Sequence, residues 1–147
     1  MQRPFRTNYA LSKVFALMLS WKEPVDLLTG QRIDLEKALV WANEGEFHHV
    51  FPKAYLRRQD VSPDKINCLA NIVLLTSASN KLISQLSPSE YFPKVQREAG
   101  GNLAQWLASN LISMETFNAA LKNDYNAFLE ARSHTLQDAM NELVGSP

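Results

Sequence analysis

Signals that begin or end a helix recur along most of this chain, and they limit it to short helices separated by tight connections. Ser, Thr, Asp and Asn accept hydrogen bonds from the free N–H groups at a helix start, Pro suits the first helical position, and Gly favours a helix end. Start signals stand at Asn8, Asp34, Ser62-Pro63, Thr76-Ser77 and Ser87-Pro88-Ser89-Glu90, and stop signals at Gly45 and Gly100-Gly101. Their spacing predicts a largely helical protein.

Apolar residues at three- and four-residue spacing indicate where these helices lie. Helices are expected after Asn8, from Leu35 to about Asn43, over 53–58, from Pro63, from Ser77 to about Gln85, from Pro88, and over 103–109, 114–121 and about 124–143. The last of them has the clearest apolar stripe, formed by Tyr125, Phe128, Leu129, Leu136, Ala139, Met140 and Leu143. Arg132 and His134 fall off that stripe, and His134 is expected at the surface.

Two segments read as strands. Phe47–Phe51 ends at Pro52, and Ile72–Leu75 is a four-residue apolar run between polar neighbours, which is typical of a strand buried on both faces. The expected fold class is therefore α+β, predominantly α. Residues 21–33, which contain Thr29-Gly30, are expected to form a loop with apolar anchors.

The composition excludes several classes of protein. The 147 residues are 46% apolar and 20% charged, which suits one packed domain over residues 1–147 rather than a disordered tail. The longest apolar run, Val14–Leu19, is far shorter than the roughly 18 residues that cross a bilayer. The lone Cys68 excludes a disulfide scaffold and paired CxxC zinc motifs. It is expected to be a small buried residue, and Trp21, Trp41 and Trp106 are expected in the core.

No secretory signal is recognised at the N-terminus, so the cytoplasm is the expected compartment, with no membrane partner. Charge is unevenly distributed, although the net charge is zero. Residues 53–97 carry seven basic and three acidic side chains, a local +4, and residues 98–147 carry two basic and six acidic ones, a local −4. A basic middle segment could bind a polyanion such as nucleic acid. Ordinary scatter of surface charge is the alternative explanation.

Three local features could together hold one metal ion. His48 and His49 lie in the strand that ends at Pro52, Asn71 directly precedes the second strand, and Asn80 lies nine positions later in the following helix. A ββα unit of this kind could hold one divalent cation between strand and helix. Adjacent residues of a regular strand point to opposite faces, so the two histidines serve one site only if the backbone bends near Pro52.

Each feature alone has a simpler interpretation. Adjacent histidines are more often surface or core residues than catalytic ones. Asn71 suits a strand entry, and Asn80 suits a polar helix position. The functional interpretation therefore depends on all of these residues occurring together at this spacing.

With these residues in place, the sequence resembles the HNH, or ββα-metal, nucleases. The matching segments are HHVFPKAYL (48–56), INCLANIVLLTSASNKLIS (66–84) and SPSEYFPK (87–94). More closely, it is similar to the C-terminal nuclease module of GmrSD-type restriction endonucleases and related phage-defence proteins that sense DNA modification. For that module the match extends to TGQRIDL (29–35) and FLEAR (128–132). The resemblance divides the chain into an N-terminal helical part (1–45), a ββα-metal core (46–86) and a C-terminal helical part (87–147).

The resemblance implies a role for each residue of the motif. His48 stands where the family often has Asp and would be a metal ligand, and Asn80 would be the second ligand. His49 would be the general base. Asn71 would orient that base and pin the loop through backbone hydrogen bonds. The basic residues that flank the motif are candidate contacts to DNA phosphates: Lys53, Arg57, Arg58 and Lys81.

One divalent metal ion, Mg²⁺ or Mn²⁺, is the expected cofactor. The amide oxygen of Asn80 suits such hard ions, whereas His48 in place of Asp removes a negative charge and shifts the preference toward Mn²⁺, Ni²⁺ or Zn²⁺. A neutral imidazole can take a proton from water near neutral pH, and a bound cation stabilises the charge that builds on the phosphate and the leaving oxygen.

The sequence therefore predicts a metal-dependent DNA endonuclease, the effector of a restriction or anti-phage defence system, whose products carry 5′-phosphate and 3′-hydroxyl ends. The family pairs this module with an N-terminal nucleotide-binding sensor domain, so such a domain, or a partner protein that supplies targeting, is expected outside these residues. Two alternatives stay open: a catalytically inactive DNA-binding module, and a helical protein-interaction domain.

Overall fold

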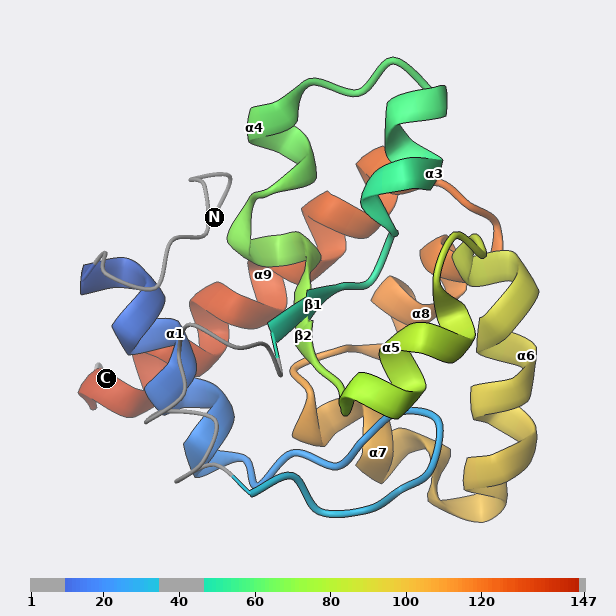
Figure 1. The fold of residues 1–147 in the computed structure, drawn as a ribbon. Helices are drawn as coiled ribbons and strands as arrows, with labels where there is room; N and C mark the ends of the chain where they lie inside the picture. The colour runs from blue at the N-terminus through green and yellow to red at the C-terminus, as the bar shows by residue number, and fades with distance from the viewer. Residues whose placement is uncertain (1–9, 35–46, 146–147) are drawn as a thin grey trace.

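The computed structural model describes residues 10–34 and 47–145, in which helices predominate over one small sheet (Figure 1). The elements are, in chain order, α1 (Ala10–Trp21), β1 (Phe47–His49), α3 (Lys53–Arg58), α4 (Pro63–Ile66), the 3₁₀ turn η1 (Leu69–Asn71), β2 (Ile72–Leu74), α5 (Ser77–Ile83), α6 (Pro88–Ala99), the 3₁₀ turn η2 (Gly100–Asn102), α7 (Leu103–Ser109), α8 (Met114–Leu121) and α9 (Tyr125–Val144). The predicted α+β class, predominantly α, is confirmed. The predicted cap at Asn8, the helix over 35–43 and Trp41 lie outside the described residues.

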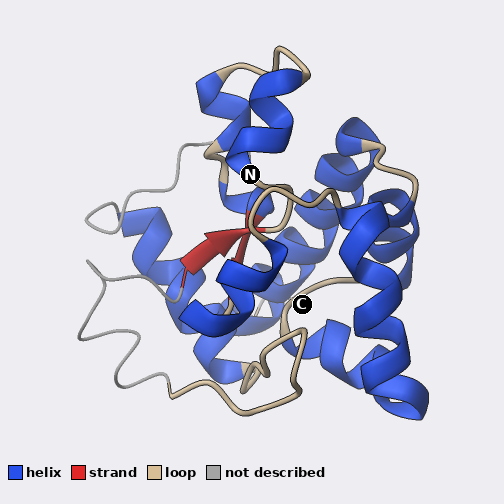
Figure 2. Ribbon diagram, turned by 45° about the vertical axis from the view of Figure 1, so that its right-hand side comes forward, coloured by secondary structure: helices blue, strands red, loops and turns tan. Residues whose placement is uncertain are grey.

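The sheet is a short antiparallel pair that helices enclose (Figure 2). His48 lies opposite Val73, and His49 lies opposite Ile72. The first strand ends at His49 rather than at the predicted Phe51. Beyond His49 the pairing continues only through Asn71, whose backbone carbonyl accepts from the Val50 N–H at 2.8 Å and whose side-chain oxygen accepts from the Phe51 N–H at 2.8 Å. The second strand ends at Leu74, one residue earlier than predicted.

The helix starts follow the signals in the sequence. Thr76 caps α5 by accepting a hydrogen bond from the Ser79 N–H at 3.2 Å. At the start of α6, the Ser87 N–H donates to the Glu90 carboxylate at 2.6 Å, which completes the predicted capping box. Asp124 caps α9 in the same way as Thr76 caps α5. Helices α7 and α8 have the predicted bounds. No helix of the described residues is both long enough and apolar enough to cross a bilayer.

The core is a cluster of buried apolar side chains that extends from α1 to α9. Beside the sheet, the ring of Phe51 packs against Tyr125 and Phe128 of α9, with centroids 4.8 and 4.9 Å apart. Cys68 is fully buried, as predicted. The prediction that Trp21 lies in the core is wrong, because its side chain is 54% exposed at the end of α1 and its ring contacts the Lys22 ammonium at 4.7 Å.

Arg132 lies off the apolar stripe of α9 and is nevertheless fully buried. Its guanidinium donates to the backbone carbonyls of Asn110, Leu111 and Ala70 at 2.9, 3.0 and 3.0 Å. Burial lowers the pKa of Arg132 to about 10. The spacing of apolar residues could not reveal this position, since the carbonyl groups that Arg132 satisfies belong to η1 and to the turn between α7 and α8. One side chain of α9 thus fastens both segments.

We expect Arg132→Met to destabilise the protein by about 3 kcal/mol or more, because it leaves three buried carbonyl groups without donors at roughly 1–3 kcal/mol each. The measurement is urea unfolding followed by circular dichroism. His134→Ala, on an exposed position of the same helix, is the control and should change stability by less than about 0.5 kcal/mol. Equal stability of the Arg132 variant and the wild type would contradict this assignment.

Candidate functional site

A pocket of about 290 Å³ brings together residues that lie far apart in the sequence. It is lined by Phe47, His48 and His49 of β1, by Pro52 and Lys53 at the start of α3, by Asn80 in the middle of α5, and by Ser84 directly after that helix. The structure therefore places both histidines and Asn80 around one hollow. Adjacent strand residues can share the pocket because β1 ends at His49, where the chain leaves the ladder toward Pro52.

His49 is held in the neutral form. Burial lowers the pKa of its imidazole to about 4, and although the hydrogen bond with Asn67 opposes that shift, the nearby charge of Lys53 adds to it. The ring nitrogen Nε2 lies 3.0 Å from Oδ1 of Asn67. At neutral pH the ring therefore has one nitrogen that can accept a proton, as a general base requires. The sequence did not indicate that Asn67 contacts His49. The only hint is that this amide side chain stands at the end of the helical turn predicted to begin at Pro63.

Asn71 is fully buried and bonds to backbone on two sides. Its Oδ1 accepts from the Phe51 N–H at 2.8 Å, and its Nδ2 donates to the Phe51 carbonyl at 3.1 Å and to the Ile66 carbonyl at 2.9 Å. These contacts hold the segment that follows His49 against the segment that precedes β2. Asn71 thus fixes the backbone that follows His49, whereas the imidazole of His49 contacts Asn67.

Asp26 sets the position of the helix that carries Asn80. This carboxylate is fully buried and accepts from the Thr76 N–H and the Ser79 hydroxyl, both at 2.8 Å, at the start of α5. It also accepts from the Leu28 N–H within its own loop. Burial alone would raise the pKa of Asp26, but these hydrogen bonds outweigh burial and keep it below its ordinary value. The sequence signal that could have indicated this contact is an Asp placed just before the Thr29-Gly30 turn.

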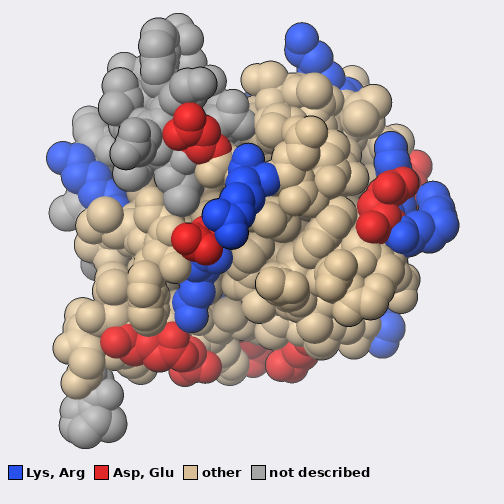
Figure 3. Space-filling model, turned by 90° about the horizontal axis from the view of Figure 1, so that it is seen from below, with Lys and Arg blue, Asp and Glu red and all other residues tan. Residues whose placement is uncertain are grey.

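The basic residues predicted to bind phosphate do not all meet at the pocket. Lys53 lines it, whereas Arg57 and Arg58 lie exposed on α3, and Lys81 lies exposed on α5. Arg58 donates to the Gln85 side chain at 3.3 Å. On the underside of the molecule, acidic and basic side chains are interspersed (Figure 3). A phosphate-binding role for these four residues stays a prediction.

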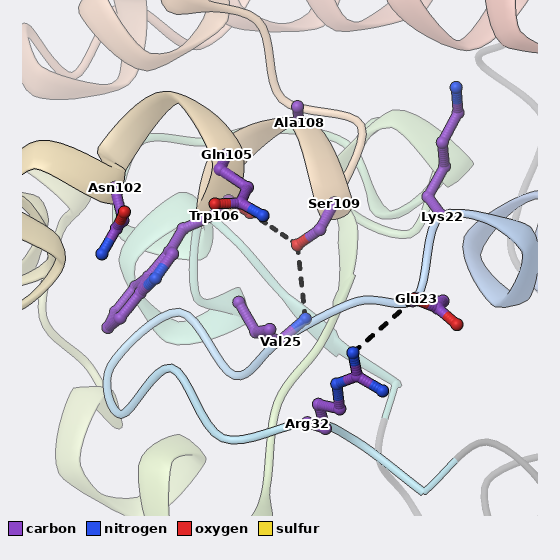
Figure 4. A pocket seen from close by; sticks show the side chains of 9 residues that line it. All are labelled: Lys22, Glu23, Val25, Arg32, Asn102, Gln105, Trp106, Ala108 and Ser109. Atoms are coloured by element: carbon purple, nitrogen blue, oxygen red, sulfur yellow. Dashed lines mark hydrogen bonds and ion pairs between the residues drawn. The ribbon is translucent and has the colours of Figure 1, made fainter.

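A larger pocket, of about 450 Å³, lies between the loop that follows α1 and helix α7 (Figure 4). Its charged groups include Glu23 and Arg32, which lie 3.9 Å apart. The Trp106 ring packs so closely on Gly30 that a Cβ atom at Gly30 would come within 2.2 Å of it. The predicted site residues line the smaller pocket and not this one. The candidate site is therefore chosen by its residues and not by the volume of the pocket.

The smaller pocket is lined by two candidate ligands for a divalent cation. His48 of β1 carries an imidazole and Asn80 of α5 carries an amide oxygen, and both residues line the pocket. Among the described residues there is no group of three or more His, Cys, Asp or Glu side chains placed to hold a metal. Two protein ligands fit an ion such as Mg²⁺, which commonly keeps several waters and binds substrate phosphate. Of the two predicted ions, an imidazole together with an amide oxygen fits Mn²⁺ better than Mg²⁺.

Comparison with known proteins adds one relative. A protein of Methanocaldococcus jannaschii, described as uncharacterized, is 27% identical over 120 residues. The alignment covers 67% of this chain and 21% of the archaeal protein, so the chain matches about a fifth of that relative's length. No family model matches the chain, and no solved structure matches it.

We expect Asn71→Ala to lower the free energy of unfolding by about 3 kcal/mol or more, because one backbone N–H and two carbonyl groups lose their buried partner. Thermal and urea unfolding measure the change. Asn118→Ala, which removes an exposed asparagine of α8, is the matched control and should be nearly neutral. Similar losses in the two variants would show that Asn71 does not hold the segment.

The low pKa of His49 also predicts how stability depends on pH in metal-free buffer. The imidazole takes up a proton at about pH 4 in the folded protein. With its ordinary pKa of 6.5, as in the unfolded chain, it takes up a proton near pH 6.5. The unfolded chain therefore binds this proton first, and stability is lost as the pH falls from about 6.5 to about 4. Urea unfolding across this range should show wild type losing more stability than His49→Gln. Parallel curves would contradict the burial of this ring.

Proposed function

We propose that this chain is a metal-dependent DNA endonuclease module of the HNH, or ββα-metal, type. The observation that carries the proposal is the single pocket lined by His48 and His49 of β1 and by Asn80 of α5. Two antiparallel strands followed by a helix form the ββα order that such a module requires. The proposed reaction is hydrolysis of a phosphodiester bond in the DNA backbone.

His49 is the proposed general base. Its unprotonated nitrogen would take a proton from the attacking water, and the low pKa keeps that nitrogen unprotonated at neutral pH. A DNA phosphate in the pocket would bring negative charge near the ring and raise the pKa of His49 toward the working pH. Proton transfer of this kind contributes typically a factor of about 10²–10⁴ in rate.

His48 and Asn80 would hold one divalent ion, Mg²⁺ or Mn²⁺. When bound, such an ion supplies Lewis-acid stabilisation to the phosphate and the leaving oxygen. Lys53 lines the same pocket and would contact a phosphate there. Arg57 and Arg58 on α3 would contact the DNA backbone beyond the pocket, as would Lys81 on α5.

The proposed setting is the cytoplasm, as the effector of a restriction or anti-phage defence system. Contacts to the backbone carry no sequence information, so targeting would come from a nucleotide-binding sensor domain or a partner protein. The far greater length of the archaeal relative leaves room for such a domain. The isolated chain should then nick DNA with little sequence preference.

Plasmid nicking tests the proposal. We expect the wild-type chain to convert supercoiled DNA to the nicked form with Mg²⁺ or Mn²⁺, and His49→Ala to reduce the rate by about 10²-fold or more, because the base is lost. A chelator should abolish the reaction. His134→Ala, which removes an exposed histidine outside the pocket, should leave the rate unchanged.

Intact supercoiled DNA at high protein concentration would reject catalysis by this chain. Retention of DNA that weakens steeply with salt would then identify a catalytically inactive DNA-binding module. Absence of salt-sensitive retention would favour a helical protein-interaction domain.

A further inference from the structure

Asn67 connects α4 to the imidazole of His49, and the direction of its amide follows from the partners. Its Nδ2 donates to the Pro63 carbonyl at 2.9 Å, and its Oδ1 lies 3.0 Å from Nε2 of His49. A carbonyl oxygen only accepts hydrogen bonds, so the amide nitrogen must face Pro63 and the amide oxygen must face the ring. The amide oxygen is also only an acceptor, and the histidine nitrogen opposite it therefore carries the hydrogen.

We propose that Asn67 is a positioning residue for His49, which holds the imidazole in the Nε2–H form and leaves Nδ1 as the nitrogen that accepts a proton. A neutral imidazole can carry its hydrogen on either nitrogen, and its hydrogen-bond partner selects which one. The catalytic meaning of this contact rests on the proposed nuclease function. The selected form of the ring, however, is a property of the folded chain that can be measured without DNA.

The turn that carries Asn67 accepts hydrogen bonds from two other segments of the protein. The carbonyl of Lys65 accepts from the Tyr125 hydroxyl of α9 at 2.6 Å. The carbonyl of Ile66 accepts from Nδ2 of Asn71 at 2.9 Å. The two residues that precede Asn67 are thus fixed by α9 and by η1, so its side chain projects from an anchored turn. A catalytic group needs this kind of support, because a base acts only from a narrow range of orientations.

The position of the hydrogen is tested on the wild-type full chain labelled with ¹⁵N-histidine, in metal-free buffer at about pH 8.5, well above the ordinary imidazole pKa. Long-range ¹H–¹⁵N correlation distinguishes a ring nitrogen that carries a hydrogen from one that does not. The chain has three histidines, and the spectra of His48→Gln and His134→Gln assign the His49 signals. We expect Nε2 to carry the hydrogen. A dominant Nδ1–H form, or an equal mixture, would overturn the proposal.

Two variants of similar shape separate positioning of the ring from simple support of α4. Asn67→Asp keeps an acceptor for His49, whereas Asn67→Leu removes it, and both lose the hydrogen bond to Pro63. We expect the Leu variant to show mixed ring forms and a nicking kcat reduced about 10–100-fold with KM nearly unchanged, while the Asp variant stays within about threefold of wild type. Equal effects of the two variants on the spectrum and on the rate would show that Asn67 only ends α4 and does not position the ring.

The two measurements keep the two proposals apart. An Nε2–H spectrum that is lost in the Leu variant supports the positioning contact even if the chain never nicks DNA, a result that would reject the nuclease. Nicking by a chain whose His49 has the other ring form would reject the role of Asn67 and keep the nuclease.

Discussion

The buried amide of Asn71 is the contact on which the geometry of the candidate site depends. It bonds to the N–H and the carbonyl of Phe51 and to the carbonyl of Ile66, much as a neighbouring strand would. The paired strands have only three residues each, and an isolated pair of such short strands is marginally stable at best. Asn71 extends the pairing at the point where the chain turns away from His49, so the ring and the pocket keep a fixed relation to the sheet.

Side chains from distant parts of the chain support this short sheet. Arg132 of α9 donates to the carbonyl of Ala70, next to Asn71, and the Tyr91 hydroxyl of α6 donates to the carbonyl of Val50, next to His49. Asp26 joins the loop after α1 to the start of α5. A buried polar group without a partner costs about 1–3 kcal/mol. These contacts therefore hold the segments beside the pocket in place and make the helical surroundings part of the site.

Much of the fold could be predicted because helix ends are local events. A cap such as Thr76, the Ser87–Glu90 capping box or a stop at Gly100 acts within a few residues of its own position. The bounds of α7 and α8 followed from such signals together with apolar spacing. The end of the first strand was less predictable, since the segment after it is held by Asn71, which lies 20 residues beyond Phe51.

The sequence by itself determined the helix-dominated class, the order of strand, strand and helix, and the four polar residues of the candidate motif. Only the tertiary structure decided that His48, His49 and Asn80 line one pocket, that Arg132 is buried, and that Asn67 contacts the imidazole. The physical reason is the range of the interactions. Capping and periodicity act between near neighbours, whereas burial of a guanidinium or selection of a ring nitrogen depends on which distant groups the fold brings within hydrogen-bond distance.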